Sequence, residues 1–349
     1  MGNYTVAGVL SGLTIAISSV ALTAPAHAMG RAGHAKLYGS FDIAVQNKDM
    51  DDGATSADAW EVESYTSIIG IKGKEKLSHG LAAIYQYELE VDPEEDSIND
   101  SNDSNFLKAR EQFIGLKGDF GAFRLGRMDT PLKKSQGKID LFSNHAGDLS
   151  STLVGEQRKG DQINYTTPTF ADAITLQLAL LQGEGDDIDG ASSGDVEDGL
   201  GDAASFNAIY NAGGLFLSFG YDDGVAYSGA SSNDTWQIAG GYAFDAFTFG
   251  AVIQGSEETN TKVESTGFLL SASYNMNGTV FKAQYADSET ENSAGTTTME
   301  ESNVSLGVDH HYSKRTTVYA EFNQKTDEDR VANTEEENTI FGVGIRKKF

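Results

Sequence analysis

Polar and apolar residues alternate with a period of two in one segment of this chain after another. From Lys36 to Gln46 the odd positions are apolar or small and the even positions are mostly polar. The pattern recurs over 81–92 and at the end of the chain, where the apolar positions run from Phe341 to Phe349. Side chains of a β-strand point to opposite faces in turn, so alternation over eight to twelve residues predicts strands with one apolar and one polar face. No comparable stripe of helical period follows residue 28, and we therefore expect an all-β fold.

Sixteen segments show this character, and the connectors between them alternate in length. The predicted strands lie near 36–47, 60–73, 80–92, 106–118, 121–128, 157–167, 173–183, 203–211, 214–222, 234–244, 246–256, 264–275, 278–288, 302–312, 316–326 and 338–349. Short connectors such as 118–121 and 275–278 contain turn-forming residues, whereas long ones such as 184–202 are acidic and rich in glycine. An even strand number, with short turns at one end and long loops at the other, is typical of an antiparallel transmembrane β-barrel of a bacterial outer membrane.

The first 28 residues differ from the rest of the chain. They contain no Lys, Arg, Asp or Glu, and the apolar run Val6 to Leu22 is followed by Thr-Ala-Pro-Ala-His-Ala. This pattern indicates a secretory signal peptide cleaved after Ala28, with a second candidate cleavage point after Ala35. A retained transmembrane anchor is the alternative. We expect residues 29–349 to form a single barrel domain.

A soluble β-sandwich would show the same alternation, because its apolar face packs on a second sheet. Two features favour the barrel: strands of ten or more residues suit a tilted membrane crossing, and aromatic residues gather near strand ends. In a barrel these aromatic residues would form girdles at the membrane interfaces. They are Tyr38, Trp60, Tyr165, Tyr221, Trp236, Tyr242, Phe244, Tyr285 and Tyr312.

Composition and charge exclude several classes of function. The 52 acidic residues outnumber the 25 Lys and Arg residues, and the net charge of −27 would repel nucleic acid. The chain has no cysteine, so it can form no disulfide and has no thiol nucleophile. The adjacent His310 and His311 point to opposite faces of a strand and cannot easily share a metal. No nucleophile elbow, phosphate loop or calcium loop is present, and we expect no catalytic residue, no metal centre, no cofactor and no enzyme activity.

Several short motifs in fixed order resemble the general porins of Gram-negative bacteria. They are Leu37-Tyr38-Gly39, Gly70-Ile71-Lys72-Gly73, the run Arg110 to Gly118, the run Phe120 to Arg127, and the closing Phe349. The resemblance covers essentially all of 36–349. It implies a sixteen-stranded homotrimer that passes ions and small hydrophilic solutes passively, with a third long loop folded inward to narrow the lumen. It also implies that Phe349 is the signal read by the barrel-assembly machinery.

The third long loop would run from about Asp129 to Gln157, with Leu141 and Phe142 packing its tip on the inner wall. The resemblance makes Asp140 and Asp148 the acidic candidates of a pore constriction. It places Arg110 and Arg158 on the opposing basic wall, with Lys72 and Arg127 as further bases. Ile68 stands where the family carries an arginine, which weakens that wall. The alternative is that Arg110 and Arg158 merely pair with lumen carboxylates such as Glu88 and Asp42.

The acidic residues gather in the long loops, on the side expected to face outward. Carboxylates there would concentrate cations, and we expect mild cation selectivity, with divalent cations bridging the loops to lipopolysaccharide as a further possibility. The outward parity of Glu111 would make sense if the first strands face another subunit in a trimer. Two alternatives stay open: a substrate-selective outer-membrane channel, and a non-conducting surface barrel that serves as adhesin or anchor.

Overall fold

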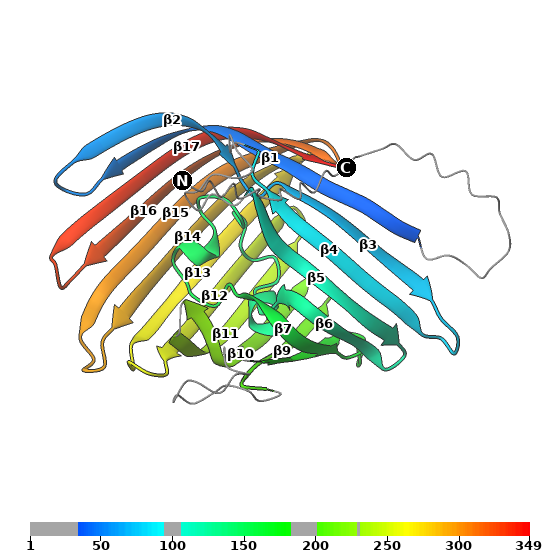
Figure 1. Cartoon of the computed structure of the whole chain (residues 1–349). Helices are drawn as coiled ribbons and strands as arrows, with labels where there is room; N and C mark the ends of the chain where they lie inside the picture. The colour runs from blue at the N-terminus through cyan, green and yellow to red at the C-terminus, as the bar shows by residue number, and fades with distance from the viewer. Residues whose placement is uncertain (1–33, 94–105, 183–200, 229–230) are drawn as a thin grey trace, which may run out of the picture. The chain divides into compact units, whose positions relative to one another are not determined.

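The computed structural model describes residues 34–93, 106–182, 201–228 and 231–349 (Figure 1). The predicted signal peptide lies outside the described residues, as do most of the acidic loops 92–103 and 184–202. The alternative cleavage point, Ala35, lies in the first strand opposite Gly73. No helix among the described residues is long and apolar enough to cross a membrane.

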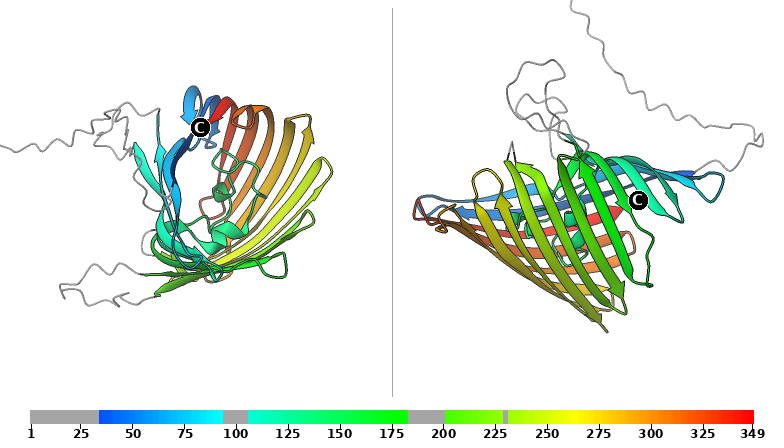
Figure 2. Two further views of the ribbon diagram at one scale, coloured as in Figure 1. Left: turned by 90° about the vertical axis from the view of Figure 1, so that its right-hand side faces the viewer. Right: turned by 90° about the horizontal axis from the view of Figure 1, so that it is seen from below.

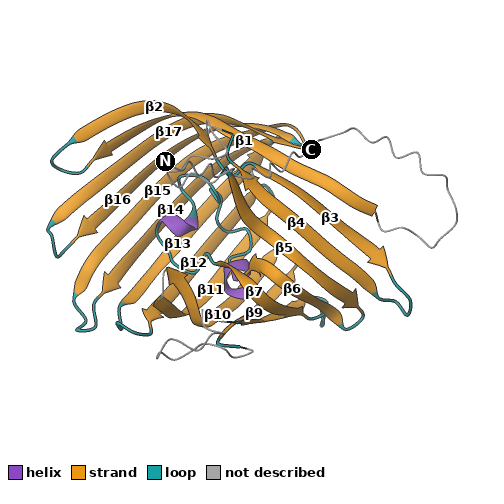
Figure 3. Ribbon diagram, in the orientation of Figure 1, coloured by secondary structure: helices purple, strands orange, loops and turns teal. Residues whose placement is uncertain are grey.

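The described chain is almost entirely β-structure, with one antiparallel sheet and two short helices (Figure 3). The strands are β1 (His34–Asp51), β2 (Ser56–Ser64), β3 (Ile68–Lys76), β4 (Ala82–Val91), β5 (Leu107–Gly118), β6 (Gly121–Asp129), β7 (Arg158–Thr166), β8 (Ile174–Leu181), β9 (Ala203–Ala212), β10 (Leu215–Ser228), β11 (Ser231–Phe244), β12 (Phe247–Glu258), β13 (Glu264–Met276), β14 (Thr279–Glu291), β15 (Thr297–Ser313), β16 (Thr316–Asp329) and β17 (Thr334–Lys348). The helices are α1 (Pro131–Ser135) and the 3₁₀ turn η1 (Leu149–Ser151), both between β6 and β7.

The sheet closes on itself because β1 pairs with the last strand, β17, in a register that places Ile43 opposite Ile345. On its other edge β1 pairs with both β2 and β3, which follow each other along β1. The two strands together therefore traverse the barrel wall once and count as a single transmembrane crossing. The result is a closed barrel of sixteen antiparallel crossings, as predicted, and the tilted strands are visible in both views of Figure 2. Short turns join the strands at one end, here called the short-turn end, and the longer connectors lie at the other, the long-loop end.

The break between β2 and β3 is a β-bulge. Between Ile43↔Ser64 and Ser40↔Ile68 the strand β1 has two residues, whereas the facing chain has three, Tyr65 to Ser67. Thr66 adopts a positive φ of 54°, and the Tyr65 amide donates to the Asp42 carbonyl at 2.9 Å. One extra residue switches which parity faces inward, so Trp60 and Val62 are exposed in β2 but Ile69 and Ile71 in β3.

The apolar face of the barrel is exposed and the polar face is buried, the reverse of a soluble protein. In β1 the outward Leu37, Phe41 and Val45 are about half exposed, whereas Asp42 and Gln46, on the other parity, are buried. Buried polar residues of the same kind recur on the other strands, including Asn164, Ser205, Asn207, Gln237, Gln254, Gln284, Asn303 and Asn323. A sandwich would bury the apolar face, so this distribution rules out the sandwich alternative and fits a barrel surrounded by lipid.

Aromatic side chains near the strand ends are exposed on the outer face, with Trp60, Phe244 and Tyr312 each more than 60 % exposed. Tyr38 is an exception to the predicted girdles. It lies on the inward parity of β1, and its hydroxyl donates to Glu88 at 2.7 Å. The girdle prediction is therefore wrong for Tyr38.

Candidate functional site

The connector between β6 and β7, residues 130–157, lies against the inward side chains of the barrel wall and is called loop 3 here. Its first turn, α1, is capped by the Thr130 side chain, which accepts a hydrogen bond from the Lys133 amide. α1 packs on β9 and β10. There Leu132 N donates to Ser205 Oγ at 3.0 Å, and Asn207 Nδ2 donates to the Pro131 carbonyl at 2.6 Å. Figure 2 shows this segment within the ring of strands.

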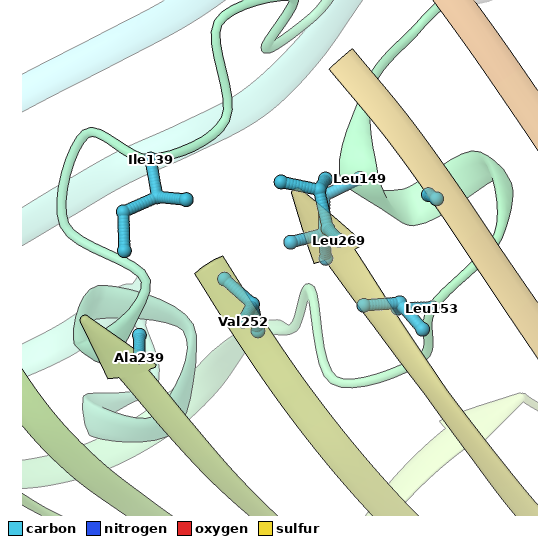
Figure 4. Close-up of a cluster of buried hydrophobic side chains, with 7 residues drawn as sticks. Ile139, Leu149, Leu153, Ala239, Val252 and Leu269 are labelled. Carbon is cyan, nitrogen blue, oxygen red and sulfur yellow. The ribbon is translucent and has the colours of Figure 1, made fainter. Parts of the chain in front are cut away.

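The middle of loop 3 is held by an apolar cluster on the otherwise polar inner face. Ile139, Leu149 and Leu153 of the loop pack with the inward residues Ala239, Val252, Leu269 and Ala286 of β11 to β14 (Figure 4). Two glycines let the loop approach this closely. A Cβ at Gly250 would stand 2.7 Å from Ile139 Cγ2, and one at Gly267 would stand 2.5 Å from Leu153 Cδ2. These inward glycines and the inward Leu269 are a sequence signal for docking that the alternation of polar and apolar residues does not by itself reveal.

The tip of loop 3 carries the Leu141–Phe142 pair. The Leu141 amide donates to Gln284 Oε1 at 2.8 Å. The Phe142 ring is buried over Gly307, and Lys282 Nζ lies 4.5 Å from the ring centroid. The Phe142 side chain packs the tip on the inner wall, whereas Leu141 is tied there through its backbone amide.

Beyond Phe142 the loop reaches the wall formed by β1, β16 and β17, where His145 enters a buried charged cluster. His145 Nδ1 lies 3.0 Å from Glu321 Oε2, and Nε2 lies 3.5 Å from Asp42 Oδ2. Arg346 of β17 hydrogen-bonds to Asp42 and contacts His145 Nε2. We call Asp42, His145, Glu321 and Arg346 the latch, because they fasten the loop to strands far from its docking cluster.

Two tyrosines complete the latch. The Tyr65 ring, turned inward by the bulge between β2 and β3, stacks on the His145 ring with centroids 4.4 Å apart. The Tyr319 hydroxyl donates to Asp42 Oδ1 at 2.7 Å. Burial lowers the pKa of His145, but the hydrogen bonds and charges of Asp42 and Glu321 outweigh that effect and raise the pKa above its ordinary value. Sequence reasoning missed the latch.

The carboxylate of Asp140 is committed to the loop itself. It accepts hydrogen bonds from the Phe142 and Leu149 amides and from Gln284 Nε2, at 2.9, 3.0 and 3.0 Å. Burial, together with the nearby charge of Asp148, raises the pKa of Asp140 to about 6. Asp148 caps η1 by accepting from Ser150 N at 2.8 Å, and it also accepts from Asn144 N. Both acids lie in loop 3 as predicted. Their backbone contacts are those of turn formation, and the bond from Gln284 ties Asp140 to the wall at β14. Their constriction role stays a prediction.

A further ion pair closes the base of loop 3. Lys133 Nζ lies 2.7 Å from Glu156 Oε2, which brings the two ends of the loop together. Burial raises the pKa of Glu156 to about 7, although Lys133 opposes that shift. Loop 3 is thus fixed at its base, in its middle and at its tip.

Arg110 and Arg158 both have carboxylate partners. Arg110 Nε lies 3.2 Å from Glu88 and its Nη1 lies 2.8 Å from Glu90. Arg158 Nη2 lies 2.9 Å from Asp129 Oδ1. The alternative, that both arginines pair with carboxylates of the lumen, therefore describes them. The predicted partner Glu88 is correct for Arg110. The partner of Arg158 is Asp129 and not the predicted Asp42.

The outward placement of Glu111 is wrong. A register shift opposite Glu88 inserts one residue at Arg110–Glu111, so both side chains face inward. Glu111 accepts from the Asp129 amide at 2.8 Å. The next residue, Gln112, lies on the outer face, because it stands opposite the exposed Tyr87. Glu111 therefore gives no support for a neighbouring subunit beside the first strands.

The remaining predicted bases lie in different places. Lys72 faces inward, with Nζ 4.3 Å from the centroid of the Tyr38 ring. Arg127 lies at a register shift, where β7 has an extra residue opposite β6, so alternation does not fix its face. Its Nε donates to the Ala109 carbonyl, and it lines a cavity with Lys159 and the buried Leu181, so its role in the wall stays a prediction. Arg124 of β6 faces inward, and the prediction missed it. Its Nη1 donates to Asn164 Oδ1 at 3.3 Å and to Thr166 Oγ1 at 3.1 Å.

Ile68, at the position of the expected missing arginine, lies inward opposite Glu90. The inner wall of β3 to β6, across from loop 3, thus carries Lys72, Arg110 and Arg124 together with the acids Glu88 and Glu90. Bases and acids on one aqueous wall, facing a fixed loop, form a polar passage that can carry hydrated solutes.

Phe349, the predicted assembly signal, ends the barrel seam. Its amide donates to the Gly39 carbonyl at 3.0 Å, and its ring lies 6.1 Å from that of Phe41 on the outer face. This placement agrees with a last lipid-facing residue of the strand, and the signal role stays a prediction.

The long-loop end is acidic in the described residues too. Asp49, Asp51, Glu335 and Glu337 line one cavity of about 350 Å³ that contains no basic residue. They share the outward parity of Val45 and Phe341, so this cavity lies on the outer side of the barrel rim. Among the residues that the structure covers, no group of three or more His, Asp or Glu has a geometry that could hold a metal ion.

Comparison with known proteins decides the family. A family model described as "Gram-negative porin" matches residues 13–330. The chain belongs to the Gram-negative porin family. It is 27 % identical, over 363 aligned residues, to the major outer membrane protein P.IB of Neisseria meningitidis serogroup B, covering 95 % of this chain and 99 % of the relative.

Solved structures share the fold of this porin. The anion-selective porin from Comamonas acidovorans aligns with a TM-score of 0.71 at 23 % identity, covering 91 % of this chain and all of the other. The trimer form of OmpT from Vibrio cholerae aligns with a TM-score of 0.62 at 16 % identity, again covering 91 % and 100 %.

Family membership confirms three predictions. The protein is an outer-membrane β-barrel of a Gram-negative bacterium, it is of the channel-forming class, and it is not an enzyme, since its relatives are porins.

Proposed function

We propose that this porin is a general diffusion channel that passes ions and small hydrophilic solutes and mildly favours cations. The observation that carries the proposal is the position of loop 3. Its docking cluster and latch occupy the inner faces of β9 to β17 and β1, while the wall of Lys72, Arg110 and Arg124 stays on the other side of the passage. A polar passage with a fixed loop favours hydrated solutes of many kinds over one tightly recognised substrate.

Cation preference is supported by the acids of the long-loop end. Glu61 and Glu63 of β2 have the inward parity near this end, since Trp60 and Val62 face outward, and Gln46 Nε2 donates to Glu61 at 2.8 Å. The net charge of the chain is −27. Fixed carboxylates at a mouth raise the local concentration of cations within the screening length of about 8 Å at physiological salt. Paired arginines on the wall, Arg110 and Arg158, oppose this preference only weakly because their charges are largely compensated.

We further propose that the protein functions as a homotrimer, inserted by the barrel-assembly machinery and surrounded by lipopolysaccharide. The trimer form of a structurally similar porin and the continuous apolar outer face support this assembly. Divalent cations at the acidic loops, bridging to lipopolysaccharide phosphates, belong to the same proposal. No organic cofactor is required.

The deciding experiment is a planar-bilayer recording of purified protein under a KCl gradient. Large conductance steps that close in threes, with a reversal potential favouring K⁺, are expected. Equal or Cl⁻-favouring potentials would contradict the cation preference while leaving the channel intact. Absence of conductance from heat-modifiable, folded protein would favour the non-conducting surface barrel. Saturation of flux by one sugar or amino acid would favour the substrate-selective channel.

A further inference from the structure

A cavity of about 580 Å³ opens at the short-turn end, on the inner side of β15 to β17. Five basic side chains line it, together with two hydroxyl side chains, and its lining contains no acid. The lining residues are His311, Ser313, Lys314, Arg315, Thr317, Arg346 and Lys348.

Three of these bases lack a compensating charge. Among the described residues no carboxylate lies within 4.0 Å of the side-chain nitrogens of Lys314, Arg315 or Lys348. Only Arg346 is paired, with Asp42 on the latch side of the cavity. Acidic residues outnumber Lys and Arg two to one in this chain. A group of bases without an acid around one cavity therefore makes this region positive in a protein of negative net charge.

The backbone around the cavity is ordered by its own hydrogen bonds. The Lys348 amide donates to the Arg315 carbonyl at 2.8 Å, and the Arg315 amide donates to Ser313 Oγ at 3.1 Å. The His311 ring pairs with Thr317 Oγ1 at 2.9 Å. These bonds fix the end of β17 beside the 313–316 turn, and so they hold the bases around a common space.

The neighbouring inner wall extends the positive region. Lys36 of β1 stands directly opposite Lys72 of β3 on the inward face. Like charges directly opposite each other in a ladder are unfavourable, and Lys36 has no ion-pair partner among the described residues to offset the repulsion. A mobile anion is the natural compensation for such an arrangement.

We propose that the cavity between the 313–316 turn and the end of β17 binds small solutes carrying phosphate groups as they pass the short-turn mouth. The proposal rests on the channel function proposed above. Arginine presents paired N–H donors that match phosphate oxygens, lysine adds point charge, and the hydroxyls of Ser313 and Thr317 add neutral hydrogen-bonding groups. The volume exceeds that of a few water molecules and accommodates a phosphorylated solute. His311, Thr317 and Arg346 have the inward register, so a soluble ligand from the lumen is favoured over a lipid head group.

The test uses the full-length purified protein and inorganic pyrophosphate as the probe. Isothermal titration in detergent at low salt should show binding that weakens steeply as KCl is raised. Pyrophosphate added to one side of a planar bilayer should lower the KCl conductance at smaller concentrations than when added to the other side. Arg346 is left unchanged in every variant because it belongs to the latch.

The variant Lys314→Gln/Arg315→Gln/Lys348→Gln should weaken pyrophosphate binding by roughly tenfold or more, in line with the loss of charge-assisted bonds. Its matched control, Lys48→Gln/Lys108→Gln/Lys262→Gln, removes three charges from the long-loop end and should bind normally. Lys314→Arg/Lys348→Arg keeps the charge and should retain binding. Arg315→Gln alone should give an intermediate loss if the triple variant does not fold.

The outcomes separate this proposal from the channel function. Normal KCl conductance without pyrophosphate binding, or with equal binding by both triple variants, overturns the phosphate site and leaves the channel standing. Loss of KCl conductance in the unsubstituted protein contradicts the channel function itself. Binding of phosphatidylglycerol micelles in place of pyrophosphate also overturns the proposal, because it assigns the cavity to lipid.

Discussion

His145 Nδ1 of loop 3 lies 3.0 Å from Glu321 Oε2 of β16, although 176 residues separate them in the chain. Each member of the latch comes from a different element, since Asp42 lies on β1 and Arg346 on β17. The contact joins the tip of the loop to the strands at the barrel seam, so the pore aperture and the closure of the sheet depend on the same side chains.

The latch should respond to pH through His145. The pKa of His145 in the folded protein is raised above the ordinary value of about 6.5. Protonation of His145 therefore stabilises the latched loop, and this stabilisation is complete at pH values below about 6.5. This stabilisation is lost as pH rises through the raised pKa. We expect single-channel conductance to be lower and quieter at about pH 5 than at about pH 9, with a change of roughly twofold.

His145→Gln should remove the part of the pH response that the latch contributes, while the titration of Asp140 and Glu156, with pKa values of about 6 and about 7, remains. His79→Asn, at an exposed short turn, is the matched control and should keep the response of the unsubstituted protein. An unchanged pH profile in His145→Gln would show that the latch does not set the aperture.

Docking of loop 3 should depend on the absence of a side chain at Gly250. An added Cβ would stand 2.7 Å from Ile139 Cγ2, so Gly250→Ala forces the loop away from the wall. We expect a loss of roughly 1–3 kcal/mol in docking, seen as noisier and altered single-channel conductance. Gly240→Ala, on the outward face of the neighbouring strand and with its nearest side-chain atom at 3.4 Å, should conduct normally. Equal behaviour of the two variants would contradict the docking account.

Ion selectivity should change when Arg110 loses its charge. Arg110→Gln leaves Glu88 and Glu90 uncompensated on the inner wall, and we expect the K⁺ to Cl⁻ permeability ratio to rise by roughly twofold. The measurement is the reversal potential under a KCl gradient. Lys347→Gln removes a positive charge from the outward parity of β17, shared with the exposed Val343 and Ile345, and should shift the potential much less. A comparable shift in both variants would contradict a specific effect of Arg110 on the passage.

Asp140→Asn tests whether this carboxylate stabilises the conformation of loop 3 or sets the ion selectivity of the passage. The carboxylate accepts bonds from two amides, at Phe142 and Leu149, and an amide group can accept with only one of its two ends. We expect a loss of roughly 1–3 kcal/mol in loop stability, detected as frequent gating events, with little change in reversal potential. A large change in reversal potential with quiet conductance would instead support the predicted constriction role.

Much of the fold was predictable because alternation reports directly on strand faces. The sixteen crossings and their order follow from it. The β-bulges broke the prediction locally, since one extra residue reverses the parity of everything beyond it. Trp60 and Val62 are even-numbered apolar positions, whereas Ile69 and Ile71 are odd, so the sequence itself carries a trace of the switch. The same reversal at Arg110–Glu111 explains why the alternation places Glu111 on the wrong face.

The site was less predictable than the fold. Asp140 could be assigned to loop 3, but whether its oxygens face water or amides depends on a turn conformation that periodicity does not encode. His145 lies in an irregular segment and meets partners from both ends of the chain. By contrast, an apolar Leu269 and a side-chain-free Gly267 on the polar face of one strand are features of the sequence alone, and they mark a docking surface.

The inner surface of this barrel is divided between two tasks. Residues of β9 to β17 and β1 grip loop 3, and a substitution there disturbs folding as well as transport. On the wall of β3 to β6, Lys72, Arg110 and Arg124 have their side-chain partners on neighbouring strands and not in loop 3. Evolution can therefore exchange charges on this wall and adapt the protein to a new mixture of nutrients while the scaffold that keeps the passage open stays intact.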